Sequence, residues 1–150
     1  MKWAWVIVVG LLLLGLIAYI VMAIESHRQP DILGLEHGLL RPCPDSPNCV
    51  CSEAQSQPDK QHAIAVLNGN DAIWLAMDRI LTELGGVVQR HDDDYMYTTF
   101  TTPVFRYVDD VEMRFDRERN VIQVRSASRV GRSDFGVNRK RVQRIRQALP

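Results

Sequence analysis

The chain begins with a long segment that carries no charge. Trp3 to Ile24 is 22 residues without an acidic or basic side chain. At a helical rise of about 1.5 Å per residue, such a segment spans roughly 33 Å, which matches the hydrocarbon core of a bilayer. Tyr19 stands near its end, where aromatic side chains gather at a membrane interface. We therefore expect residues 1–28 to form one transmembrane anchor that contacts the membrane through residues 3–24.

A cleaved signal peptide is the alternative, because Val21-Met22-Ala23 has the form of a cleavage site. The apolar run exceeds the roughly 7–15 residues typical of signal peptides, which favours an uncleaved anchor. Lys2 precedes the run, whereas Glu25 offsets Arg28 beyond it. Basic flanks remain in the cytoplasm, so this count favours a domain on the other side. The expected localisation is the inner (cytoplasmic) membrane, single-pass, with the C-terminal domain on the periplasmic or exported side.

Charge is distributed unevenly along the remaining chain. The net charge is zero, so no overall field favours nucleic acid, and we expect no nucleic-acid partner. Residues 125–150 nevertheless hold eight basic residues against one acidic residue, while residues 92–118 hold eight acidic residues against three arginines. The two stretches are candidates for pairing with each other.

Residues 29–62 are rich in proline and have no sustained periodicity, which predicts an extended, turn-rich linker. Prolines between Cys43 and Cys49 can fold the chain back, and on the exported side a disulfide closing this loop is favoured. Cys51 remains as a third thiol, able to compete with Cys49. A zinc site that uses the three cysteines with His37 or His62 is the alternative, although its spacing lacks the usual knuckle.

Residues 63–150 predict an α+β domain. Asn70 caps a helix with an apolar stripe, and Gly85-Gly86 ends it. Strand patterns follow, and a basic helix is expected at 138–149. The order favours an antiparallel sheet of about four strands with two helices packed on it, preceded by the transmembrane helix. The expected strands are 63–67, a strand beginning at 87–88, 95–102, 104–116 and 121–128.

The last two strands predict a hairpin around residues 117–120. If Asp116 faces Val121, then Glu112 faces Arg125 as a cross-strand ion pair, and Asp109 faces Ser128 on the apolar face. A buried carboxylate needs partners. We expect Ser128, Arg129 or Arg132 to supply them, unless a bulge at 108–110 turns Asp109 outward.

The segment 125–139 combines arginines, hydroxyls and glycines between a strand and a helix start, which is typical of anion binding. The candidate phosphate- or carboxylate-binding residues are Arg125, Ser126, Ser128, Arg129, Arg132, Ser133 and Asn138. The competing interpretation is structural: these arginines pair with Asp109, Asp110 and Glu112 and fix the last helix.

An enzyme is a further alternative, in which Ser126, Ser128 or Ser133 acts as nucleophile with His62 or His91 as base. Nothing in the sequence places these groups together, and no G-x-S-x-G motif occurs. The acidic run beside His91 indicates a solvated turn better than a metal site. We therefore expect no cofactor and no metal.

Three blocks of sequence resemble the signature of the domain-of-unknown-function family 1499: residues 43–50, residues 108–112 and residues 125–141. The resemblance spans about residues 35–148. It implies a domain from bacteria or plastid-bearing organisms, often behind an export signal, with no assigned activity. The family pattern has serine at the position of Cys51, which implies that Cys43 and Cys49 form the natural pair.

These observations favour a non-catalytic envelope module that binds an anionic ligand or partner, such as an anionic lipid, a cell-wall fragment or an envelope protein. A structural or assembly protein of the envelope, without a ligand site, is the second hypothesis. A hydrolase is the third.

Overall fold

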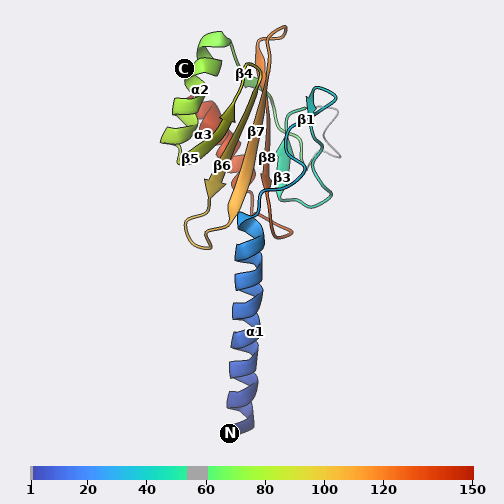
Figure 1. Cartoon of the computed structure of the whole chain (residues 1–150), viewed down its shortest axis with the longest axis vertical. Helices are drawn as coiled ribbons and strands as arrows, with labels where there is room; N and C mark the ends of the chain where they lie inside the picture. Colours follow the sequence, from blue (N-terminus) through green and yellow to red (C-terminus); the bar gives the residue numbers. More distant parts are fainter. Residues whose placement is uncertain (1, 54–60) are drawn as a thin grey trace.

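The computed structural model describes residues 2–53 and 61–150, which form one long helix and an α+β domain (Figure 1). The helices are α1 (Lys2–His27), α2 (Asp71–Glu83) and α3 (Val137–Ala148). Helix α1 leaves one end of the domain, and the C-terminus lies at the opposite end (Figure 1). The predicted α+β class, with an antiparallel sheet behind an N-terminal apolar helix, is confirmed, whereas the predicted number of strands is not.

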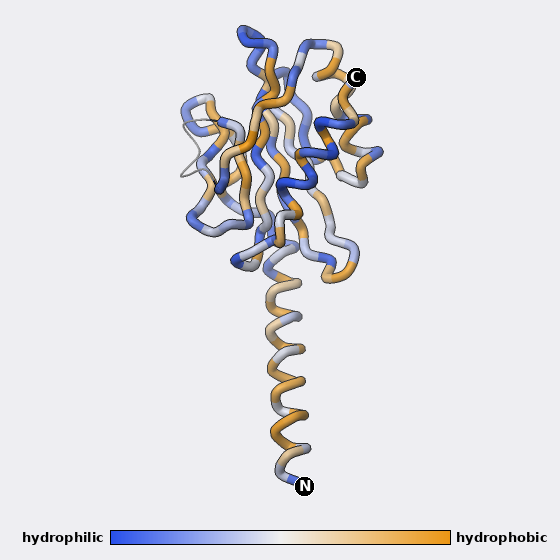
Figure 2. The backbone as a smooth tube through the Cα atoms, turned by 180° about the vertical axis from the view of Figure 1, so that it is seen from behind, coloured by the Kyte–Doolittle hydropathy of each residue, from blue (hydrophilic) through white to orange (hydrophobic). Residues whose placement is uncertain are grey.

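Helix α1 is long and apolar enough to cross a membrane. Figure 2 shows apolar residues along nearly its whole length, whereas apolar and polar residues alternate along the chain of the domain. Between its first turn and Val21 almost every side chain is exposed, because only the end of the helix contacts the domain. Such an apolar surface, left uncovered by protein, fits a lipid environment.

Antiparallel strands form one six-stranded sheet, with the order β3-β8-β7-β6-β5 and with β4 also paired to β8. Its strands are β3 (Cys49–Cys51), β4 (Leu67–Asn68), β5 (Gly86–His91), β6 (Tyr95–Thr101), β7 (Val108–Asp116) and β8 (Val121–Ser128). A separate hairpin joins β1 (Leu35–Glu36) to β2 (Leu39–Leu40). The expectation of about four strands was therefore too low. The expected strand at 63–67 was also misplaced, because β4 contains only Leu67 of it, and β3 is too short to produce an alternating pattern.

Helices α2 and α3 cover one face of the sheet (Figure 1). Asn70 caps α2 as predicted, since its side chain accepts a hydrogen bond of 2.8 Å from the Ile73 amide. Trp74 from α2 and Ile145 from α3 belong to the same buried cluster as Met113 from the sheet. This cluster is the main core.

The other face of the sheet is covered by residues 29–53, within the predicted linker. A second buried cluster joins this segment to the sheet; it contains Leu40, Cys43, Cys49, Cys51, Tyr95, Tyr97 and Ala127. The segment also supplies edge strand β3, whose residues pair with Arg125, Ser126 and Ala127 of β8. Residues 54–60 of the predicted linker lie outside the described part of the chain.

The predicted hairpin register is confirmed, with Asp116 opposite Val121, Glu112 opposite Arg125 and Asp109 opposite Ser128. Strand β7 begins at Val108, however, whereas the sequence predicted a start at 104. Residues 102–107 form a turn instead, in which the Thr102 amide donates to the Tyr107 carbonyl at 2.8 Å and Arg106 has a φ of 58°. This left-handed backbone cannot continue a strand.

Candidate functional site

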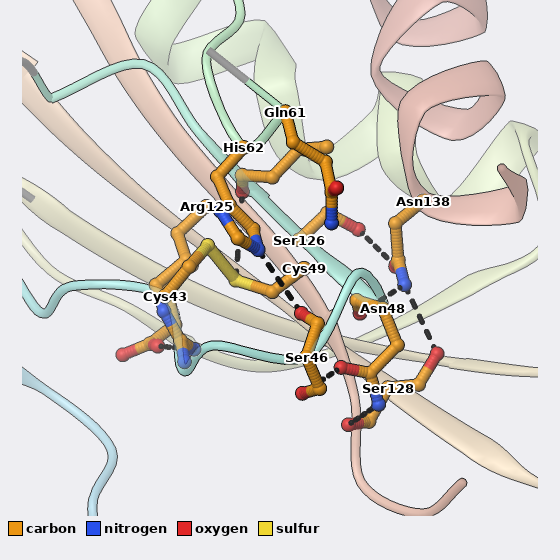
Figure 3. The surroundings of a disulfide bond; sticks show 12 residues. Cys43, Ser46, Asn48, Cys49, Gln61, His62, Arg125, Ser126, Ser128 and Asn138 are labelled. Atoms are coloured by element: carbon orange, nitrogen blue, oxygen red, sulfur yellow. Dashed lines mark hydrogen bonds and ion pairs between the residues drawn. A yellow bond between two sulfur atoms is a disulfide. The ribbon is translucent and has the colours of Figure 1, made fainter. Parts of the chain in front are cut away.

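The cysteine loop is closed by a disulfide between Cys43 and Cys49, as the sequence predicted (Figure 3). The zinc alternative is wrong, since two of the three thiols are oxidised. Cys51 is fully buried and takes no part in this disulfide. Burial raises the pKa of Cys51 from 9.0 to about 11, which keeps it protonated and unreactive at neutral pH.

Arg125 lies inside the protein and forms the predicted cross-strand ion pair. Its Nη1 is 3.0 Å from Glu112 Oε2, and the two side chains are 7% and 0% exposed. The other Glu112 oxygen accepts hydrogen bonds from the Gly34 amide at 2.8 Å and from the Tyr95 hydroxyl at 2.7 Å. Burial, reinforced by the Glu112 carboxylate, raises the pKa of Tyr95. The charge of Arg125 is therefore paired within the fold, so this arginine has a structural role.

Arg129 joins the sheet to the end of helix α1. It forks onto Asp110 at 2.8–3.0 Å and donates to the Tyr97 hydroxyl at 2.7 Å. Its Nη1 also donates to the main-chain carbonyls of Ser26 at 3.0 Å and of Arg28 at 3.2 Å. Ser26 is fully buried, and its hydroxyl accepts a hydrogen bond from the Val108 amide at 2.5 Å. Arg129 thus holds the C-terminal end of α1 against the sheet.

Asp109 is buried on the core face, as expected, and no bulge turns it outward. Its partner is Arg141, with Nη2 2.5 Å from the carboxylate Oδ2, instead of the expected Ser128, Arg129 or Arg132. The expectation failed because α3 brings Arg141 over this face, whereas Arg129 points to the opposite face. Arg141 also stacks on the Phe100 ring, with 4.9 Å to the ring centroid.

A polar network at the start of α3 gathers three of the candidate anion-binding residues (Figure 3). The Asn138 amide nitrogen donates to the Asn48 carbonyl at 2.9 Å and to the Ser128 hydroxyl at 3.0 Å. The Ser126 hydroxyl donates to the Asn138 side-chain oxygen at 2.6 Å. Arg141 donates to both Ser126 and Asn138. The network therefore ties the disulfide loop, the sheet and α3 together.

The first amides of α3 are already bonded within the chain. Asp134 accepts from the Gly136 amide at 3.0 Å and from the Asn138 amide at 2.7 Å. A carboxylate here takes the place that an anion would take at a helix start. Arg132 and Ser133 lie on the exposed turn before it.

A cavity of about 710 Å³ lies beside α3, next to the end of α1. Apolar side chains dominate its wall, including Met22 of α1, Phe100 of the sheet and the exposed Phe135. The Arg141–Asp109 pair and Asp134 also line it. Lys140 and Arg144 line it from α3, and within the described residues neither has an ion-pair partner. The cavity thus combines an apolar wall with two available cations.

The profile of a family of proteins of unknown function (DUF1499) matches residues 39–149. The chain belongs to this family. The matched range covers the disulfide loop, the sheet, α2 and α3 and leaves out α1. No curated protein and no solved structure gives a significant match. DUF1499 membership therefore defines the domain without assigning it an activity.

In the described part of this DUF1499 domain, the candidate serines and histidines make other contacts. His62 Nε2 lies 3.0 Å from the Ser46 carbonyl oxygen. The hydroxyls of Ser126 and Ser128 bond to Asn138, and Ser133 accepts from the Phe135 amide. His91 packs edge-on against Trp74, at 5.4 Å between ring centroids. Within residues 2–53 and 61–150, no group of three potential metal ligands meets.

Sequence reasoning missed the residues that shape the cavity. Arg141 and Lys140 stand in a uniformly basic helix, where no local pattern separates a buried arginine from exposed ones. The apolar run Val104-Phe105 predicts a strand, although Pro103 just before it indicates a turn.

Proposed function

We propose that this DUF1499 protein is a membrane-anchored, non-catalytic module that binds an anionic ligand in the cavity beside α3. The observation that carries the proposal is the position of Lys140 and Arg144 on a mostly apolar cavity wall. The two residues are four positions apart on α3, so they lie on one face of the helix. Within the part of the chain that the structure describes, neither cation forms an ion pair, and two such cations in a concave site favour an anionic ligand.

The arginine-rich segment supports this site indirectly. Arg125 and Arg129 pair with Glu112 and Asp110 and hold the scaffold, while Ser128 and Ser133 contribute to the cavity wall. Internal pairing of the two arginines also favours the second candidate, a structural protein of the envelope without a ligand. The two candidates differ in whether the cavity is occupied.

The proposal includes an uncleaved anchor and an exported domain. Cleavage after Ala23 would remove Tyr19 and Met22, which contact the domain at Phe105, at Tyr107 and at the cavity. These contacts support a retained helix. The Cys43–Cys49 disulfide supports an oxidising compartment and hence the exported side of the inner membrane.

The test is to identify what the protein carries from its native membrane. The full chain would be purified in a mild detergent, and co-purifying anions would be identified by mass spectrometry. We expect the wild type to carry an enriched anion that is lost in a Lys140→Ala, Arg144→Ala double variant.

The matched control removes two exposed arginines outside the cavity, in an Arg79→Ala, Arg119→Ala double variant. Loss of the Arg79–Glu83 surface pair costs little, since such exposed pairs contribute about 0–1 kcal/mol. Equal recovery of the anion from a folded cavity variant would overturn the proposal.

A further inference from the structure

We infer that the ligand of the cavity is an anionic lipid of the same bilayer that holds α1. This inference rests on the proposed function and adds the class of ligand. The polar head would lie between Lys140 and Arg144, and an acyl chain would lie along the apolar wall toward the membrane.

The depth of the turn at residues 102–107 is the first argument. The ring of Tyr19 on α1 lies 6.4 Å from the Phe105 ring and 6.2 Å from the Tyr107 ring. Tyr19 precedes Ile24, the last residue of the uncharged segment, by five positions. At about 1.5 Å per residue, the turn reaches roughly 7.5 Å below the end of that segment. When α1 spans the bilayer, Phe105 therefore lies at or below the membrane surface.

Exposed apolar side chains at this end of the domain are the second argument. Phe135 is 89% exposed, Val104 is 76% exposed and Phe105 is 56% exposed, and all three line the cavity. Both the β6–β7 turn and the segment before α3 lie at the end from which α1 leaves (Figure 1). Large apolar side chains grouped in this way mark a contact with membrane or protein. Because α1 adjoins these side chains and lies in the membrane, we take the membrane, rather than a protein, as the partner.

The direction of α3 is the third argument. The helix starts beside Phe135 at the membrane end and runs toward the C-terminus at the opposite end (Figure 2). Lys140 and Arg144 consequently lie farther from the membrane than Phe135. Apolar groups are nearest the hydrocarbon, and cations lie above them, which is the order of an anionic lipid with its chain in the membrane. A small soluble anion would leave the apolar wall unused.

The test uses the full chain in a non-ionic detergent and native mass spectrometry. Three probes are titrated: phosphatidylglycerol, phosphatidylcholine and glycerol 3-phosphate, which has the charge without the chains. We expect one phosphatidylglycerol to bind in preference to the other two. Each basic residue near an anionic headgroup contributes roughly fivefold in affinity, so the Lys140→Ala, Arg144→Ala variant should bind about 25-fold more weakly.

A second variant, Val104→Ser, Phe135→Ser, tests the apolar wall. These side chains are mostly exposed, so their replacement leaves the packed core intact, and thermal unfolding checks this. We expect at least about tenfold weaker phosphatidylglycerol binding, because the chain loses apolar contact area. The matched control is Leu75→Ser, Val87→Ser, two exposed apolar residues outside the cavity, which should bind as the wild type does.

The outcomes separate the two proposals. If glycerol 3-phosphate binds as tightly as phosphatidylglycerol, or if the apolar variant binds phosphatidylglycerol like the wild type, the lipid inference is overturned while anion binding stands. If the cationic variant binds every anionic probe like the wild type, or if phosphatidylcholine binds as well as phosphatidylglycerol, the proposed function is overturned too.

Discussion

At the scale of single residues, the acids of β7 explain how a basic segment can lie inside a small domain. Glu112 has no exposed surface, yet both of its oxygens are bonded, to Arg125 on one side and to Gly34 and Tyr95 on the other. A buried charge without such partners would destabilise the fold by several kcal/mol. The alternation of β7 places Glu112 and Asp110 on one face and Asp109 on the other, so each acid has its own arginine.

Replacing Glu112 by glutamine should therefore destabilise the domain strongly. The variant leaves Arg125 as a buried cation without a counterion, and we expect a loss of about 3 kcal/mol in the free energy of unfolding. Urea unfolding of the full chain in detergent measures it. Glu83→Gln in the exposed Arg79 pair is the control, with an expected change below about 0.5 kcal/mol. A loss below about 1 kcal/mol for Glu112→Gln would contradict the structural role assigned here.

Cys51 predicts a dependence of stability on alkaline pH. Its pKa in the folded chain is raised by burial to about 11, so the folded state holds the thiol proton more tightly than the unfolded state does. The contribution of this thiol to the free energy of unfolding is complete below pH 9 and is lost as the pH rises toward 11. The wild type should therefore lose stability relative to Cys51→Ser over this range, because serine does not ionise. Unfolding free energies of both proteins between pH 7 and pH 10.5 measure the difference, and parallel curves would contradict it.

At the scale of helices and strands, the predictable parts were those with a local signal. Helix α2 has a cap, an apolar stripe and a glycine stop, and the β7–β8 hairpin register follows from the loop at 117–120 together with the alternation of side chains. Strands β3 and β4 are two or three residues long and pair with β8, so their positions depend on tertiary contacts more than on a pattern in their own residues. The same limit applies to the site. That Arg141, rather than its neighbours, reaches Asp109 depends on how α3 docks, which no spacing in the sequence encodes.

The junction between α1 and the sheet predicts a local effect of one arginine. In Arg129→Lys, a single ammonium can keep a bond to Asp110 but cannot also reach the Ser26 and Arg28 carbonyls. We expect faster hydrogen exchange at the end of α1 and at the Val108 amide, by about tenfold or more, with little change in the amides of α2. The matched control is Arg28→Gln, which removes an exposed pair from the same segment. If these amides exchange no faster in Arg129→Lys than in Arg28→Gln, Arg129 does not hold the junction.

At the scale of the whole molecule, the apolar helix and the disulfide predict an orientation. With the N-terminus in the cytoplasm, a C-terminal reporter that is active only in the exported compartment should give a signal. The reporter should remain attached to a chain that still begins with the residues of α1, as intact-mass measurement can establish. A stable but silent fusion would reverse the orientation, and a chain starting at Ile24 would indicate a cleaved signal peptide.

The buried Ser26 has a consequence for the working range of the protein. A domain on a long, slack tether can search a wide volume above its membrane. Here the last turn of α1 is itself part of the folded domain. A domain anchored as proposed would therefore have almost no tether of its own and would diffuse only laterally with its helix. Its partners would have to come to the membrane surface or already reside there.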